Sequence, residues 1–370
     1  MEKIGIICEY NPFHNGHLYH IKKIKEMYND SIIILVLNGY FLQRGEISIL
    51  SKKDKTKIAL EHGIDLVVEL PFVYGTQSAD VFASNSVDIL NQLKVDKVVF
   101  GSECNDIDKL RKIAEHQINN KETYDIEVKK HLKNGLNYPT AMAKALNMEF
   151  EFNPNDLLGI SYLKRIIEKK YTIESITIER TNNYLDILSN DSIISATNIR
   201  EKIRNNIDIS PYLPSSSLEK IIDINYDKYF ELLKYKIISE HDLSIYLDVD
   251  EGIENRLKKV INDAKNIDDL IKKVKSKRYT YNKISRMLIH ILIGLTKEDN
   301  KSLNDCYIKI LGFNTTGKKY LNTVKKELNL TVDKNSKIYK YEIICAYIYD
   351  MITNDDSIDF EQKNSPIQHK

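Results

Sequence analysis

The sequence lacks the features that mark several classes of protein. No apolar stretch among its 370 residues reaches the roughly 18 residues that a membrane-spanning helix needs, so no membrane partner is expected. The formal net charge is only +1, so a surface for nucleic acid must be a local patch. The four cysteines form no C-x-x-C pair, which indicates reduced thiols. A strand expected from residue 3 leaves no room for a signal peptide, and we expect a cytoplasmic protein.

Two common nucleotide-binding motifs are also missing. The chain has neither G-x-G-x-x-G nor G-x-x-x-x-G-K-[ST], so neither a dinucleotide fingerprint nor a P-loop accounts for a bound nucleotide. The chain is nevertheless long enough to bury a full core and to form two domains.

Strand-like and helix-like patterns alternate through the N-terminal half, which is typical of an α/β fold with a doubly wound parallel sheet. We expect strands at residues 3–8, 31–37, 65–70, 96–100 and 174–178. We expect helices from residue 16, at 52–62, 78–93 and 155–169, and from residue 195. Ligands of such sheets bind at the carboxyl ends of the strands. Unusual polar segments follow these ends at residues 9–17, 38–46, 101–103, 180 and 195–200.

The tetrad His14-Asn15-Gly16-His17 lies between the first strand and the helix after it. Free N–H groups and the positive end of the helix dipole favour an anion there, and two imidazoles three residues apart can both face it. Gly16 lets the backbone approach the ligand, and Pro12 sets the entry of the loop. This pattern predicts a site for the α-phosphate of ATP, with His14 and His17 as catalytic residues that gain a proton readily beside the anion.

Other interpretations of the same residues stay open. The H-x-x-H spacing also occurs in metal sites, but no further ligands stand at familiar spacing, and we predict no metal site. Asn155 fits either the cap of its own helix or a ligand contact, and Arg180 either a solvent ion pair or the nucleotide pocket. Gly101 stands where a side chain would obstruct a base or ribose. The 195–200 turn, capped by Ser195 or Thr197, is either a surface helix start or a triphosphate site.

Six segments together resemble the bacterial tRNA(Met) cytidine acetate ligase family, and the resemblance runs through most of the chain. They are residues 9–17 (EYNPFHNGH), 41–46 (FLQRGE), 69–71 (ELP), 100–103 (FGSE), 154–159 (PNDLLG) and 277–280 (KRYT). One departure is Tyr184-Leu185-Asp186, where the family tends to have Tyr-His-Asp. We therefore give that turn no catalytic role.

The resemblance implies a nucleotidyltransferase fold of the H-x-G-H type, and an enzyme that activates acetate with ATP and transfers the acetyl group to N4 of the wobble cytidine of elongator tRNA(Met). Mg²⁺ is expected to accompany the triphosphate. H-x-G-H nucleotidyltransferases usually bind the triphosphate at a turn like that of Ser195 and Thr197. The implied ATP-binding residues are Ile7, Cys8, Glu9, Tyr10, Asn11, Pro12, Phe13, His14, Asn15, Gly16, His17, Leu18, Tyr19, His20, Gly101, Asn155 and Arg180.

The C-terminal half offers a surface for the tRNA. Beyond Pro214 the periodicity is helical to about residue 351, which predicts a mainly α-helical domain. We divide the chain into a catalytic domain (1–210), a tRNA-binding domain (215–355) and a frayed polar tail (356–370). A basic run interleaved with Tyr279 and Tyr281 suits RNA phosphates and stacking, or is a solvated helix end. The predicted RNA-binding residues in this run are Lys277, Arg278, Lys283 and Arg286.

The wobble base must leave its stack to react, and an aromatic side chain could hold it. Tyr10, Phe13 and Tyr40 are candidates by position, although such rings are more often ordinary packing residues. Two rival functions remain: a nucleotidyltransferase that acts on a small phosphate ester, and a non-catalytic RNA-binding protein with the same fold.

Overall fold

A seven-stranded sheet forms the centre of the computed structural model, which describes residues 1–370 apart from 135, 137, 147–151, 181–191, 277–278 and 304–306. The strand order is β5-β4-β1-β2-β3-β6-β7. The strands are β1 (Glu2–Cys8), β2 (Ser31–Asn38), β3 (Leu66–Leu70), β4 (Lys97–Ser102), β5 (Glu174–Glu179), β6 (Ile310–Phe313) and β7 (Ile367–Gln368). The first five are mutually parallel, and the order reverses between β1 and β4. The predicted doubly wound α/β fold is confirmed.

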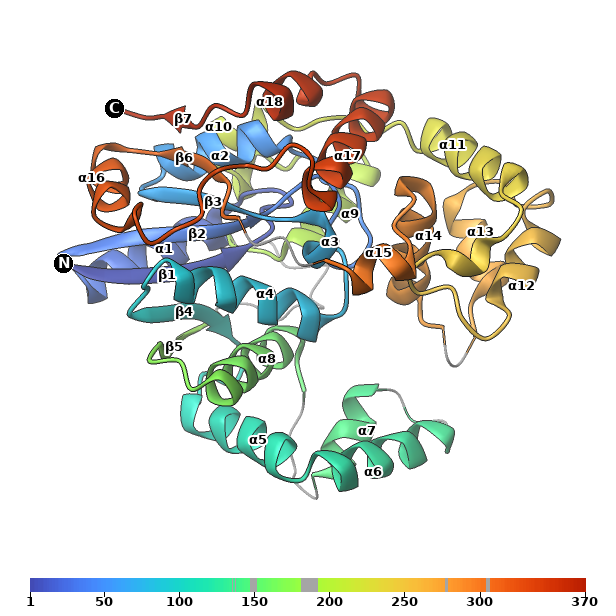
Figure 1. The fold of residues 1–370 in the computed structure, drawn as a ribbon, viewed down its shortest axis with the longest axis horizontal. Helices are drawn as coiled ribbons and strands as arrows, with labels where there is room; N and C mark the ends of the chain where they lie inside the picture. The colour runs from blue at the N-terminus through green and yellow to red at the C-terminus, as the bar shows by residue number, and fades with distance from the viewer. Residues whose placement is uncertain (135, 137, 147–151, 181–191, 277–278, 304–306) are drawn as a thin grey trace.

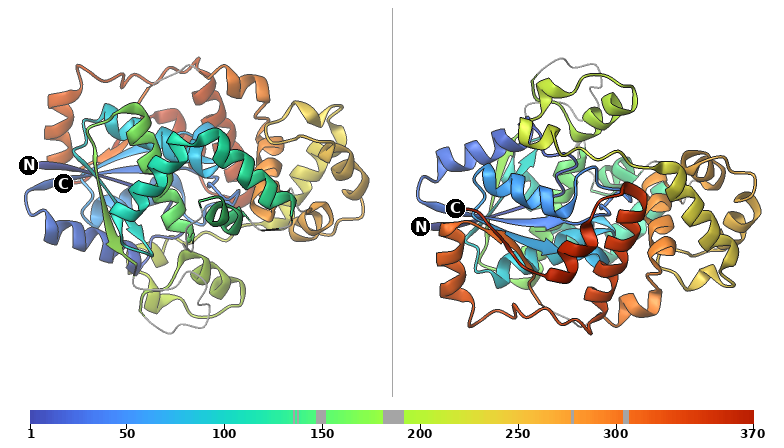
Figure 2. Two further views of the ribbon diagram at one scale, coloured as in Figure 1. Left: turned by 90° about the horizontal axis from the view of Figure 1, so that it is seen from below. Right: turned by 90° about the horizontal axis from the view of Figure 1, so that it is seen from above.

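Helices cover both faces of this sheet (Figures 1 and 2). Every residue of β2 after Ser31 is therefore buried. Ile33, Leu35 and Leu37 pack with α1 (Asn15–Met27) and α2 (Lys52–Glu61). The alternate residues Ile32, Ile34 and Val36 pack with the helices of the opposite face. On that face α4 (Ala79–Gln92) contacts β2, and α8 (Pro154–Lys169) packs on α4 and β4. Helix α5 (Ile107–Asn119) packs on α8, and α6 (Lys121–Lys133) and α7 (Tyr138–Ala145) extend beyond it, away from the sheet (Figure 1). A single turn, α3 (Phe72–Gly75), follows β3.

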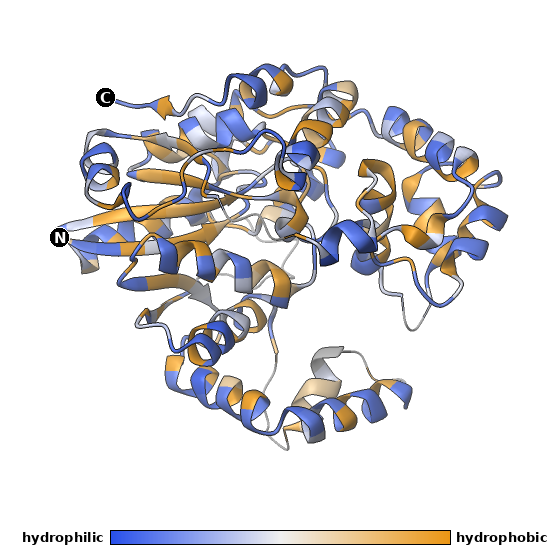
Figure 3. Cartoon of the chain, in the orientation of Figure 1, coloured by the Kyte–Doolittle hydropathy of each residue, from blue (hydrophilic) through white to orange (hydrophobic). Residues whose placement is uncertain are grey.

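The region after β5 is mainly helical: its central part lies to one side of the sheet, whereas the segments near the C-terminus return to the sheet (Figure 1). Its helices are α9 (Ala196–Arg204), α10 (Ser215–Leu218), α11 (Tyr226–Ser239), α12 (Ile253–Val260), α13 (Ile267–Val274), α14 (Tyr281–Ile293), α15 (Lys297–Lys301), α16 (Thr315–Val324), α17 (Lys337–Thr353) and α18 (Ser357–Lys363). Apolar residues concentrate in the strands and on the inner sides of the helices (Figure 3). One core joins α11, α14 and α17 to Tyr40, Phe41 and Ile47 of the segment after β2.

Two details of the C-terminal half correct the sequence predictions. Residues 310–313 lie inside the region predicted to be helical, yet they form β6, which runs antiparallel to β3. A strand of four residues is too short to interrupt a helical pattern visibly. The tail is not frayed: it forms α18 and β7, and Glu361 is completely buried. The division into two domains stays a prediction.

Among the described residues, we find no helix with both the length and the apolar character needed to cross a membrane.

Candidate active site

The H-x-G-H segment forms the turn from β1 into α1, as predicted. Tyr10 adopts a left-handed backbone conformation with φ 50°, and the Asn11–Pro12 peptide is cis. His14 is the extended N-cap residue of α1, and the helix begins at Asn15. The positive end of the helix dipole therefore stands at the carboxyl edge of the sheet.

His14 and His17 form a reciprocal cap at this helix end. Nδ1 of His14 accepts a hydrogen bond from the N–H of Gly16 at 3.0 Å, and Nδ1 of His17 accepts one from the N–H of His14 at 3.1 Å. A ring nitrogen that accepts carries no proton, so each imidazole is a neutral tautomer with its proton on Nε2. Both rings thus keep an Nε2–H group as a hydrogen-bond donor for an anion.

The surroundings hold both rings in this neutral form. Burial lowers the pKa of His14 to about 3, with further contributions from Arg180 and Arg200. Burial also lowers the pKa of His17 well below its usual value, and His14, His20 and Arg180 add to the effect. Both rings are therefore neutral when no anion is bound, and the prediction that they gain a proton beside an anion stays a prediction. A proton on Nδ1 would also break the cap, because that nitrogen would no longer accept.

Three strand ends meet beneath the first turns of α1. Cys8, Val99 and Ile178 all belong to the core that α1 shares with the sheet. Gly101 stands two residues after Val99, and Arg180 two after Ile178, so both lie on that same face. A Cβ atom at Gly101 would lie 3.3 Å from Cγ of Arg180, so the glycine leaves space for the Arg180 side chain.

Two buried nitrogen atoms at these strand ends form no hydrogen bond within the described residues. They are Nε of Arg180, which is a donor, and Nε2 of the His20 ring. Burial and Arg180 lower the pKa of His20 to about 4, so the His20 ring is neutral. Arg180 lies 3.8 Å from the carboxylate of Glu103 and forms an ion pair with it. An anion at this edge would meet one guanidinium and several neutral donors.

Lys55 holds together the ends of β1 and β2, a role that the sequence analysis missed. Its ammonium donates to the carbonyl oxygens of Glu9 at 3.2 Å, Asn38 at 2.7 Å and Gly39 at 2.6 Å. Burial lowers the pKa of Lys55 to about 7, although the Glu9 charge opposes this shift. The three carbonyl acceptors match the three N–H groups of an ammonium, which favours the charged form. A lysine on the sheet-facing side of a helix was the available signal.

The Glu9 carboxylate joins the same two loops from the other direction. Its Oε1 accepts hydrogen bonds from the main-chain N–H of Gln43 at 2.7 Å and from the side chain of Asn38 at 3.0 Å. The Glu9 carboxylate therefore has a structural role, because it links the loop after β1 to the segment after β2.

Asn155 does not cap its own helix, because the N-cap residue of α8 is Asn153. The Asn155 amide donates to Oε1 of Glu103 at 2.5 Å. The following residue, Asp156, is completely buried and accepts from Ser102 Oγ at 2.6 Å and from the N–H of Glu103 at 3.1 Å. These bonds fix the β4 end beside Arg180.

Ser195 caps α9 by accepting a hydrogen bond from the N–H of Asn198 at 3.2 Å, as one of the two predicted interpretations states. Arg200 of this helix turns inward and donates to the carbonyl oxygen of Asn11 at 2.7 Å. It also pairs with the carboxylate of Glu46 at 2.8 Å. The basic residue of the turn therefore braces the H-x-G-H loop.

The chain matches the family model described as "HIGH Nucleotidyl Transferase" over residues 1–364. A tRNA(Met) cytidine acetate ligase of Caldicellulosiruptor saccharolyticus is 41% identical over 92% of this chain and 89% of its own length. One of Fusobacterium nucleatum is 38% identical over 94% of each chain. The chain belongs to the tRNA(Met) cytidine acetate ligase family. The crystal structure of Thermotoga maritima TmcAL bound with alpha-thio ATP superimposes with a TM-score of 0.84, at 27% identity, over 100% of this chain and 99% of that one.

The aromatic residues that were candidates for holding a base in this ligase family member are all buried. Tyr10 is 1% exposed, Phe13 is completely buried and Tyr40 is 2% exposed. Phe13 stacks on His17 and on His62, Tyr10 meets His17 edge to face, and the Tyr40 hydroxyl donates to Glu361 at 2.9 Å. Ordinary packing, which is the more frequent role of such rings, therefore accounts for all three side chains.

The predicted RNA-binding patch is only partly described. Lys277 and Arg278 lie outside the described residues. The Lys283 ammonium lies 4.1 Å from the centroid of the Tyr279 ring. Arg286 turns toward the catalytic half, where its guanidinium donates to the carbonyl oxygen of Gln43 at 3.3 Å. Lys283 thus stays a candidate RNA contact, and Arg286 has a structural partner.

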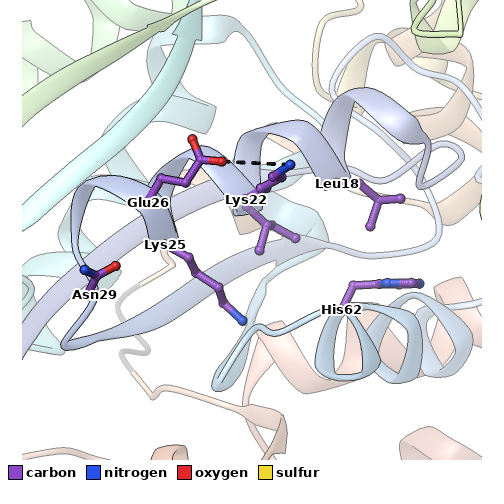
Figure 4. A pocket seen from close by; sticks show the side chains of 7 residues that line it. Leu18, Lys22, Lys25, Glu26, Asn29 and His62 are labelled. Carbon is purple, nitrogen blue, oxygen red and sulfur yellow. Dashed lines mark ion pairs between the residues drawn. The ribbon is translucent and has the colours of Figure 1, made fainter.

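A hollow of about 470 Å³ lies between α1 and the end of α2 (Figure 4). Leu18, Lys22, Lys25 and His62 are among its lining residues. Neither His14 nor His17 lines it, so this hollow is separate from the candidate phosphate site.

Among the described residues, one group of three carboxylates could in principle hold a metal ion: Glu69, Glu342 and Glu361. The ammonium of Lys52 donates to all three, at 2.5, 2.7 and 2.5 Å respectively. A lysine therefore occupies the position that a cation would take.

Proposed function

We propose that this protein ligates acetate to the wobble cytidine of elongator tRNA(Met), with ATP as the source of energy. The observation that carries the proposal is the reciprocal histidine cap at the start of α1, in a chain that aligns over most of its length with tRNA(Met) cytidine acetate ligases. The cap provides Nε2–H donors at the positive end of the helix dipole.

In the first half-reaction, an acetate oxygen forms a bond to the α-phosphorus of ATP, and the bond to the bridging oxygen breaks. Acetyl-AMP and pyrophosphate are the products. The neutral rings of His14 and His17 donate hydrogen bonds to the phosphate oxygens as negative charge builds up on them, and Arg180 supplies a positive charge. Because the donors are already fixed by the cap, they need little reorganisation.

In the second half-reaction, the cytidine N4 amine attacks the acetyl carbonyl carbon. The bond from that carbon to the AMP oxygen breaks, the amine loses a proton, and AMP leaves. The RNA must reach the same edge of the sheet for this transfer, since the mixed anhydride forms there.

The described residues offer no free carboxylate set for Mg²⁺ at this edge. Glu9 accepts from Gln43 and Asn38, Glu46 pairs with Arg200, and Glu103 accepts from Asn155. We therefore assign no protein ligand to Mg²⁺.

The test is transfer of radiolabelled acetate to unmodified elongator tRNA(Met) by the purified protein with ATP and Mg²⁺. We expect labelled tRNA with the wild type and none with His17→Ala, because the substitution removes an Nε2–H donor and one bond of the cap. His116→Ala is the matched control, since that histidine is exposed on α5. Pyrophosphate release that needs a different acceptor in place of acetate would instead identify a nucleotidyltransferase for small phosphate esters. If the protein released no pyrophosphate with any acceptor, the remaining interpretation would be a non-catalytic RNA-binding protein.

A further inference from the structure

Two tyrosines are exposed close to the candidate active site. Tyr226 is 45% exposed and Tyr281 is 42% exposed. They are the first residues of α11 and α14. These rings are available to a partner, in contrast to the buried rings of Tyr10, Phe13 and Tyr40.

Helix packing brings the two rings to the same place. Helix α11 packs against α14, and both belong to one core. Tyr229, one turn after Tyr226, is only 4% exposed within that core. Burial raises the pKa of Tyr229, and both Tyr226 and Tyr281 raise it further, so both lie near this one residue.

Neighbours of both tyrosines contact the active-site loops. Tyr281 precedes Ser285 by one turn, and the Ser285 hydroxyl donates to the carbonyl oxygen of Gly45 at 2.6 Å. The Arg204 guanidinium acts electrostatically on the Tyr226 hydroxyl, and it also pairs with Glu201 at 2.6 Å. Arg204 follows Arg200 by one turn of α9, and Arg200 holds the carbonyl of Asn11.

The Tyr281 ring is held in place, because its hydroxyl donates to Asp268 at 2.5 Å. Burial raises the pKa of the Tyr226 hydroxyl, and the nearby Arg204 guanidinium opposes that shift. The Arg204 side chain is itself 55% exposed, and an arginine in that position can pair with a phosphate or lie flat on a base. Fixed aromatic rings beside an arginine are how proteins hold the unstacked bases of RNA loops.

We propose that Tyr226, Tyr281 and Arg204 form a stacking platform for unpaired bases of an RNA loop, next to the H-x-G-H loop. The proposal rests on the proposed function, because an acetylated cytidine must leave its stack and reach the sheet edge. The platform is where neighbouring bases of the same loop are held during transfer.

The experiment measures equilibrium binding of two labelled RNAs to the full-length protein. One is the anticodon stem-loop of elongator tRNA(Met), and the other is the same stem as a blunt duplex without a loop. We expect Tyr226→Ala and Tyr281→Ala each to weaken stem-loop binding about 10-fold or more, since stacking on one ring contributes about 1–3 kcal/mol per base. Duplex binding should change less than about 2-fold, because paired bases cannot stack on these rings.

Two kinds of control separate stacking from damage to the fold. Tyr226→Phe and Tyr281→Phe keep the ring and should regain most of the stem-loop affinity. Tyr235→Ala removes a ring that is 72% exposed on the same helix, α11, and should bind both RNAs like the wild type. The thermal unfolding midpoint of each variant shows whether it is folded.

The outcomes distinguish the two proposals. Equal stem-loop affinity for wild type and both folded alanine variants would overturn the platform, as would equal losses for loop and duplex. If the wild type transfers acetate but does not need the rings, the proposed function stands and the platform fails. If binding needs the rings but no acetate is transferred, the platform stands and the proposed function fails.

Discussion

His14 and His17 each use one ring nitrogen for the backbone and keep the other for a ligand. The bonds to Nδ1 fix the tautomer, the ring orientation and the end of α1 together. The phosphate donors and the helix cap are therefore the same residues. A substitution that retains only the capping function separates these two roles.

We predict that His14→Asn keeps the stability of the protein and still abolishes acetate-dependent pyrophosphate release. Asparagine is a good N-cap, whereas His14→Ala should lower the free energy of unfolding by about 1 kcal/mol as well as abolish activity. Urea unfolding and pyrophosphate assays of both variants check this. An active His14→Asn variant would show that the Nε2–H donor is not needed.

The same histidine should make stability depend on pH. Its pKa is lowered from 6.5 to about 3 in the folded protein, so between these values only the unfolded chain binds the proton. The free energy of unfolding should therefore fall as the pH falls below about 6.5, and this slope should be smaller in His14→Asn. Urea unfolding at several pH values measures both slopes. Equal slopes in the two proteins would contradict the prediction.

We predict that Lys55→Met raises the KM for ATP at least about 10-fold, an effect of about 1.4 kcal/mol. The substitution leaves the carbonyl groups of Glu9, Asn38 and Gly39 without their donor, so the two loops at the sheet edge lose their common anchor. Lys53→Met is the control, because Lys53 is exposed on the same helix. Steady-state kinetics with varied ATP give the result, and an unchanged KM would remove Lys55 from the site.

At the scale of elements, the segment after β2 connects the sheet to the helical region. Phe41 and Ile47 pair across a tight turn whose Gly45 lies directly on the backbone of α14. This contact aligns the catalytic edge with the helices that carry Tyr226 and Tyr281. The turn therefore fixes the position of the helical region relative to the carboxyl edge of the sheet.

We predict that Gly45→Ala lowers the free energy of unfolding by more than the cost of placing alanine in a left-handed conformation, because the substitution also disrupts this contact. Gly45 has φ +75°, and its Cβ would lie 2.3 Å from the main-chain nitrogen of Arg286. Gly294→Ala is a matched control, because Gly294 has φ +86° with nothing within 4 Å. We expect a cost of about 1–2 kcal/mol at Gly294 from conformation alone, and a larger one at Gly45. Equal losses in urea unfolding would argue against tight docking of the turn.

At the scale of the whole molecule, a buried charge cluster ties the C-terminal tail to the sheet. Lys52 and Lys309 lie among Glu69, Glu342 and Glu361, which come from β3, α17 and α18. Burial and the neighbouring carboxylates raise the pKa of Glu342, whereas the two lysines outweigh burial and hold the pKa of Glu361 low. The tail is thus part of the folded core.

Glu361→Gln should lower the free energy of unfolding by about 3–5 kcal/mol near pH 7, because it leaves two buried lysines poorly compensated. The pKa of Glu361 is lowered from 4.5 to about 2, so the stabilisation by this carboxylate is lost as the pH falls from about 4.5 toward 2. The difference between wild type and variant should therefore shrink over that range. Asp359→Asn on the same helix breaks only an exposed pair with Lys363 and should cost less than about 1 kcal/mol. Urea unfolding measures both, and equal effects would contradict a structural tail.

The sequence by itself determined the five parallel strands, the helices between them and the H-x-G-H segment at the mouth of α1. These features depend on local periodicity and on turn residues, which are visible in a short window. Only the tertiary structure decided which nitrogen of each histidine is free, that Arg200 and Lys55 brace the site, and that Tyr40 is buried. It also decided that residues 310–313 and the tail join the sheet. These outcomes depend on partners far away in the chain, such as Glu361 for Tyr40, and no local pattern specifies such partners.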